Sequence, residues 1–88
     1  MINYTLERVI TREGILRRVY NVGAPEDFEL QIPHSGEVID FIQPQEKQNL
    51  KAYIGHDVFI TGVEVLDPRW PRTPILKVRK LEPAPSTP

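Results

Sequence analysis

The chain lacks cysteine entirely and has a single tryptophan among its 88 residues. Without cysteine there is no disulfide framework, no thiolate zinc site and no thiol nucleophile. No apolar run is long enough for a signal peptide or for a membrane-spanning helix. We therefore expect no membrane insertion. The localisation stays open between the cytoplasm and export with the signal already removed.

A strong basic excess is also missing, because the formal net charge is −1. The simplest argument for nucleic-acid binding is therefore absent. A local basic patch is still possible, since a patch acts within a Debye length of about 8–10 Å. Apolar residues make up 40% of the chain, which is enough for the core of one small domain.

Alternating and β-branched segments predict strands along most of the chain. Gly14 interrupts the first of them, which predicts either one long bent strand or a leading strand followed by a second one. One helix is predicted over residues 45–54, with an apolar stripe of Leu50, Tyr53 and Ile54, and it ends at Gly55. The predicted strands cover residues 4–12, 15–20, 28–32, 37–42, 57–66 and 75–81.

This order predicts an all-β fold: a five-stranded antiparallel barrel of the OB type, with one helix between the third and fourth strands. An SH3-like barrel is the alternative, but it has only a short 3₁₀ turn where this helix is expected. We expect residues 1–12 to form a leading strand or extension, residues 13–82 the barrel, and residues 83–88 a disordered proline-rich tail.

Two segments carry a resemblance to a family. Residues 50–62 read LKAYIGHDVFITG and are similar to an L-x-x-Y-x-G-x-x-V-x-V-x-G segment. Residues 67–74 read DPRWPRTP and are similar to a D-x-R-W-P-x-T-P signature. Both resemble small bacterial OB-fold or SH3-like domains of largely uncharacterised, often envelope-associated proteins. The resemblance covers residues 13–82 and implies a barrel, but no activity.

The first candidate for ligand binding is the loop that contains Arg69, Trp70 and Arg72. The tryptophan ring offers a flat surface for a base or a sugar, and the arginines offer contacts to phosphate. The alternative, which we favour, is that Trp70 folds back over the barrel end as an apolar plug while the arginines stay in solvent.

The second candidate is a set of basic residues on the first and last strands, in which Arg17, Lys77 and Arg79 are expected to share a face with Tyr20 nearby. Such a face would follow the backbone of a single-stranded nucleic acid. The alternative is ordinary edge-strand charge, which discourages aggregation.

The histidines, His34 and His56, lie in predicted turns without the spacing of a catalytic triad or of a metal site. We therefore predict no catalytic residue, no metal and no cofactor. The sequence favours a non-enzymatic interaction module that binds a protein partner or associates with itself, with Val9 and Ile10 available for strand pairing. The alternative is binding of single-stranded nucleic acid or of an oligosaccharide.

Overall fold

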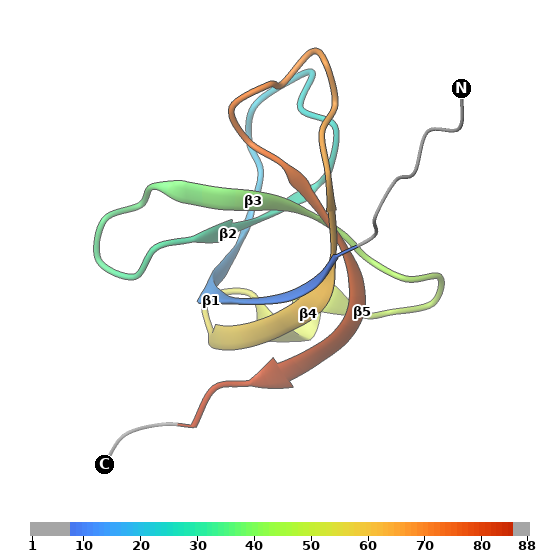
Figure 1. The fold of residues 1–88 in the computed structure, drawn as a ribbon. Coiled ribbons are helices and arrows are strands. Elements are labelled where there is room, and N and C mark those ends of the chain that lie inside the picture. Colours follow the sequence, from blue (N-terminus) through green and yellow to red (C-terminus); the bar gives the residue numbers. More distant parts are fainter. Residues whose placement is uncertain (1–7, 86–88) are drawn as a thin grey trace.

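The structure is a computed structural model that describes residues 8–85 (Figure 1). It confirms the all-β prediction, with five strands and almost no helix. The elements are β1 (Val9–Arg18), β2 (Phe28–Gln31), β3 (Val38–Gln43), the 3₁₀ helix η1 (Leu50–Tyr53), β4 (Asp57–Val65) and β5 (Ile75–Pro83).

Each strand pairs with two others, so the sheet closes on itself in the order β1-β2-β3-β5-β4. The prediction of a purely antiparallel sheet is wrong for one pair, because β3 and β5 run parallel. β5 follows β4 in the sequence but lies between β3 and β4 in the sheet. β4 and β5 are antiparallel to each other. Alternation along a strand shows its two faces but not its neighbours.

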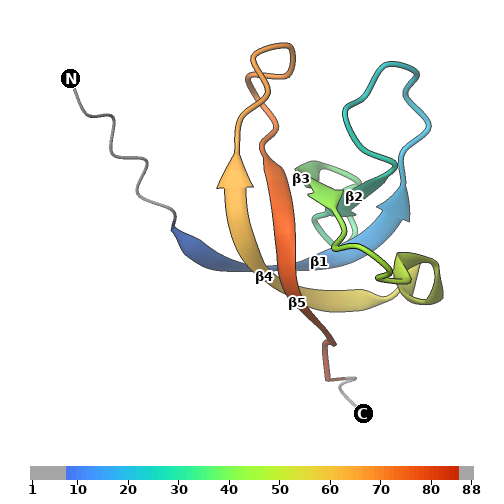
Figure 2. The same cartoon turned by 90° about the vertical axis from the view of Figure 1, so that its right-hand side faces the viewer.

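β1 changes partner along its length and bends as it does so (Figure 2). Its first part pairs with β4 and its last part with β2, and Ile15 pairs with both. Gly14 is buried at this point, where a Cβ atom would lie 2.5 Å from the carbonyl oxygen of Gln31. The predicted boundary between residues 12 and 13 falls inside this continuous strand, while residues 1–7 of the predicted extension lie outside the described residues.

Alternate residues of the strands face the interior and form one apolar core. Each fully buried aliphatic side chain contributes about 1.5–3 kcal/mol relative to an exposed one. Leu50 of η1 is the one member that comes from outside the strands. The core consists of Leu16, Leu30, Ile42, Leu50, Val58, Ile60, Leu76 and Val78.

The predicted helix over residues 45–54 is wrong in length, because only Leu50–Tyr53 is helical and the geometry is 3₁₀. Lys47 has a φ of 66°, in the left-handed region, and this ends any continuous helix before residue 48. Asn49 then caps η1 by accepting a hydrogen bond from the Lys51 amide at 3.2 Å. Residues three apart eclipse in a 3₁₀ turn, so Leu50 and Tyr53 share a face without a longer helix.

Gly62 lies where the register between β4 and β5 shifts. A Cβ atom there would collide with the carbonyl oxygen of Lys77 on β5. β5 continues to Pro83, and the Ala84 amide donates to the Asp57 carbonyl oxygen at 2.9 Å. The first residues of the predicted tail therefore belong to the folded part, and residues 86–88 lie outside the described residues.

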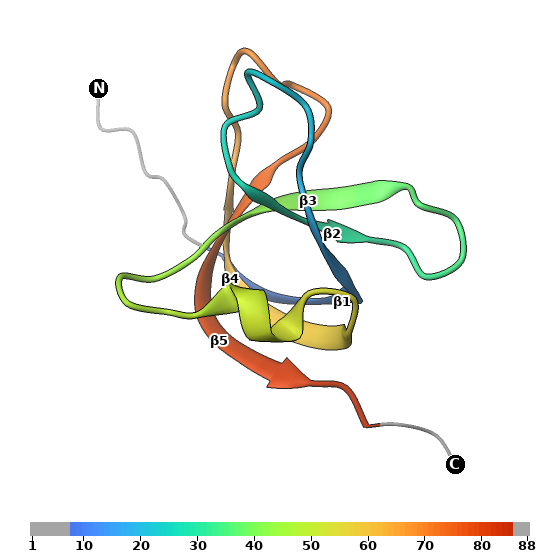
Figure 3. The same cartoon turned by 180° about the vertical axis from the view of Figure 1, so that it is seen from behind.

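Two long loops, residues 19–27 and 66–74, project from the same end of the closed sheet (Figures 1 and 3). η1 lies away from them, beside the turn into β4 (Figure 3). The backbone of this turn pairs with β1, since the Gly55 amide donates to the Leu16 carbonyl oxygen at 2.7 Å. β1 therefore connects the region of η1 to the loop 19–27.

Three strands contribute to a polar cluster in which Asp40 is buried and the ion pair of Arg12 with Glu64 is open to solvent. Asp40 of β3 is completely buried and neither of its oxygens has a hydrogen-bond donor. Burial, together with the neighbouring carboxyl group of Glu64, raises the pKa of Asp40 to about 8 against the opposing effect of Arg12. Arg12 donates to both oxygens of Glu64, at 3.3 and 3.1 Å. Burial disfavours ionised Glu64, but the hydrogen bonds and the charge of Arg12 outweigh this effect and lower the pKa of Glu64.

We predict that Gly62→Ala lowers the free energy of unfolding by about 2–3 kcal/mol, because the new methyl group must displace the β5 backbone. Chemical denaturation followed by circular dichroism measures the change. Gly14→Ala is the matched comparison at the other close approach, where part of the contact is with the Leu30 side chain. A Gly62→Ala protein as stable as the natural chain would contradict this packing.

We also predict that stability falls as the pH rises from about 4 to about 8. Across this window folded Asp40 keeps a proton that the unfolded chain has released, so rising pH favours unfolding. Glu64 has the opposite sign, and its contribution is lost on acidification below its unfolded pKa. Asp40→Asn removes the titration and should exceed the natural chain in stability at about pH 9 by about 1–3 kcal/mol.

Denaturation curves over this pH range test the expectation, with Glu46→Gln in the exposed turn as the control. If Asp40→Asn and the natural chain lose stability in parallel, another group is responsible for the pH dependence.

Candidate functional site

A hollow of about 470 Å³ opens on the outer side of β1 and β2, next to η1. Its volume lies in the range typical of small-ligand clefts. Two of its residues, Arg17 and Tyr20, were predicted as ligand contacts from the sequence. Its lining consists of Arg17, Arg18, Tyr20, Glu29, Gln31 and Ile54.

The two arginines are consecutive on β1 but are held in different ways. Arg18 is opposite Phe28 of β2, and its guanidinium carbon lies 5.7 Å from the centre of that ring, a cation–π distance. The Nη1 atom of Arg17 lies beside Gly55, 3.7 Å from where a Cβ atom would stand. Within residues 8–85 neither guanidinium forms an ion pair with a carboxylate. Both charges therefore remain available to an anionic group.

The strand β2 contributes hydrogen-bond acceptors to the hollow. The side-chain amide of Gln31 donates to Glu29 Oε2 at 2.6 Å, which fixes both side chains. Glu29 is opposite Arg17 in the register of β1 and β2, but its carboxylate is bound to Gln31 instead. The second oxygen of Glu29 and the amide oxygen of Gln31 can accept hydrogen bonds from a bound molecule.

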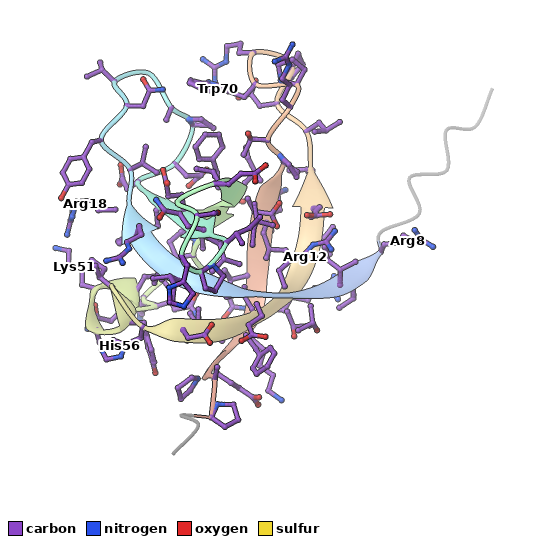
Figure 4. All side chains as sticks on the ribbon, turned by 90° about the vertical axis from the view of Figure 1, so that its left-hand side faces the viewer. Arg8, Arg12, Arg18, Lys51, His56 and Trp70 are labelled. Carbon is purple, nitrogen blue, oxygen red and sulfur yellow. The ribbon has the colours of Figure 1, made fainter. Side chains whose placement is uncertain are left out.

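Apolar and aromatic surface completes the hollow. Tyr20 follows the end of β1 and is 87% exposed, so its ring is open to solvent. Ile54 follows η1 and provides an aliphatic wall. Two further basic residues, Lys51 and His56, lie on the same side of the molecule as Arg18 (Figure 4). This side therefore combines positive charge with accessible apolar surface.

The basic residues of β5 do not join this group. β1 and β5 both flank β4, as expected, but Arg17 lies beyond the part of β1 that pairs with β4. Lys77 is instead beside Val63 and Gln43. The carbonyl oxygen of Arg79 accepts from the Gln45 side chain at 3.3 Å. The expectation that Arg17, Lys77 and Arg79 share a face is therefore wrong, because the register separates them.

The loop 66–74 holds its residues through internal contacts. Arg69 forms an ion pair with Asp67 at 2.9 Å, and its backbone amide also donates to Asp67 at 2.9 Å. The hydrogen bonds from the side chain and the backbone of Arg69 lower the pKa of Asp67. Trp70 is partly buried and its ring meets Phe41 of β3 edge-on, with centroids 5.4 Å apart. The tryptophan thus covers an outer residue of β3, while Arg72 is exposed. Trp70 is therefore partly buried, but it covers the outer face of β3 and not the barrel end, where the favoured alternative expected a plug.

Other chemistry has little support in the described part of the chain. His34 and His56 are exposed in turns, and His34 has a φ of 67°. Residues 8–85 contain no group of three or more side chains arranged to hold a metal ion. No helix in the same range is long and apolar enough to cross a membrane.

Sequence reasoning missed the β2 side of the hollow. Glu29 and Gln31 alternate with Phe28 and Leu30, so the pattern places them on the outer face. The pattern does not predict that the arginines of β1 lie beside Glu29 and Gln31, because this depends on the register of β1 and β2. The contact of Phe41 with Trp70 was not predicted either, because it joins a strand to a loop that is distant in the sequence.

We predict that Trp70→Ala lowers the free energy of unfolding by about 2–3 kcal/mol through loss of the contact with Phe41, and that Trp70→Phe costs less. Denaturation followed by circular dichroism measures both, since the variants have no tryptophan fluorescence. Unchanged stability of Trp70→Ala would show that the ring does not contribute to the fold.

Comparison of the chain with protein-family models, with curated proteins and with solved structures found no match.

Proposed function

We propose that this protein is a non-enzymatic interaction module of the OB type, which binds a protein partner in the hollow on β1 and β2. The observation that carries the proposal is the pair of guanidinium groups, Arg17 and Arg18, with no carboxylate partner in the described chain beside an exposed tyrosine. Unpaired arginines and exposed aromatic rings are enriched where proteins bind one another.

The strand arrangement supports the OB assignment. Five strands close in the order β1-β2-β3-β5-β4, and this strand order is the feature that supports the OB type. The 3₁₀ turn η1 between β3 and β4 is what we expected of the SH3-like alternative, so it adds no support. OB folds are five-stranded, partly open Greek-key barrels that bind ligands over strands 2 and 3 and the loops between strands 1 and 2 and strands 4 and 5. The hollow shares β2 and the loop 19–27, which it reaches at Tyr20, with that binding surface.

Single-stranded nucleic acid is a second candidate, favoured by the position of Tyr20 next to two arginines. An exposed ring can stack on a base while guanidinium groups contact the phosphates. The free side-chain oxygens of Glu29 and Gln31 in the same hollow find no hydrogen-bond donor on a phosphate backbone, whereas the N–H groups of a peptide can bind them. We therefore place the protein partner first.

A random-peptide display library, selected on the natural protein, tests the proposal. We expect enriched peptides that bind the natural chain and lose roughly tenfold in affinity to Arg17→Gln or Arg18→Gln, the scale of one charge-assisted hydrogen bond. Lys77→Gln, an exposed cation outside the hollow, is the matched control and should bind normally.

Circular dichroism melting shows that each variant is folded before its binding is compared. Light scattering of the free protein shows whether the chain itself is the partner. Absence of enriched peptides, or equal binding to the Arg17→Gln, Arg18→Gln and natural proteins, would reject the hollow as a protein-binding site.

A further inference from the structure

We infer that the hollow takes an extended acidic peptide segment that also carries an apolar side chain. This inference rests on the proposed function and names the chemistry of the partner. It follows from three features of the hollow: its unpaired cations, its acceptor groups on β2, and its apolar wall.

The cations require negative charge from the partner. Arg17 and Arg18 both line the hollow without a carboxylate within residues 8–85, and Lys51 and His56 lie on the same side (Figure 4). The cation–π contact with Phe28 restrains the Arg18 guanidinium, and a guanidinium without a carboxylate partner can form a bidentate contact with one. Acidic side chains of a peptide match this arrangement.

The acceptors on β2 distinguish a peptide from a nucleic-acid backbone. Glu29 and Gln31 leave carboxylate and amide oxygens that need N–H donors. A peptide backbone provides N–H groups and carbonyl groups in alternation, so it can donate to β2 and accept from the arginines. A phosphate backbone provides acceptors only, so it leaves these two oxygens without donors.

The apolar part of the hollow needs a side chain to cover it. Ile54 and the exposed ring of Tyr20 contribute surface that gains stability when removed from water. A leucine-sized side chain within the acidic segment can supply this contact. Free phosphate or acetate supplies charge alone and leaves this surface uncovered.

The test uses the full chain and fluorescence anisotropy with three labelled probes. The first is a short peptide of aspartate and glutamate around one leucine. The second replaces its acidic residues by asparagine and glutamine, and the third is an oligothymidylate of similar length. We expect the acidic peptide to bind at least roughly tenfold more tightly than either of the others, and to weaken as salt is raised.

Variants locate the binding. Arg17→Gln and Arg18→Gln should each weaken the acidic peptide roughly tenfold. Arg18→Lys, which keeps the charge but not the planar fork, should give an intermediate loss. Lys77→Gln is again the control.

Each other outcome overturns the inference in a recognisable way. Equal binding of the acidic and neutral peptides removes the role of charge. Tighter binding of the oligonucleotide, lost in Arg17→Gln, favours the nucleic-acid candidate. If the display library yields non-acidic peptides that depend on Arg17, the proposed function stands and only the acidic partner is wrong.

Discussion

The fold depends on β1 serving two neighbours in succession. Its first part pairs with β4, its last part pairs with β2, and Ile15 contacts both strands. Without this exchange of partner the sheet would have open edges and could not enclose its core. Gly14 permits the bend because no side chain stands between β1 and the carbonyl oxygen of Gln31. The same bend brings Arg17 and Arg18 next to β2, so the closure of the sheet also forms the hollow.

The protein separates two sets of charges by their surroundings. Beside the buried Asp40, Arg12 and Glu64 pair with each other, and burial raises the pKa of Asp40 so that it stays protonated. The charges of Arg12 and Glu64 are used within the protein, so they are not available to bind a partner. Outside, Arg17 and Arg18 have no carboxylate among the described residues and face a hollow. Only this outer set is arranged to attract another molecule.

The sequence was sufficient for the strands and insufficient for their register. Alternation of apolar and polar residues predicted the strands, and Gly14 predicted the long bent strand β1 as one of two alternatives. The apolar stripe of η1 fitted a long helix and a single 3₁₀ turn equally well, so its length was wrong. Local patterns do not specify which strands pair or in which register. For this reason the sequence did not show the parallel pairing of β3 and β5, the β2 side of the hollow or the separation of Lys77 from Arg17.

The position of Arg18 over Phe28 links recognition to the integrity of the core. Phe28 packs against the apolar core on one side and against the guanidinium on the other. The guanidinium of Arg18 lies over the ring of Phe28, so a molecule that drew Arg18 away would expose this aromatic surface to water. A molecule that binds Arg18 where it lies leaves the ring covered. Binding that keeps the contact with Phe28 therefore avoids the cost of exposing the ring.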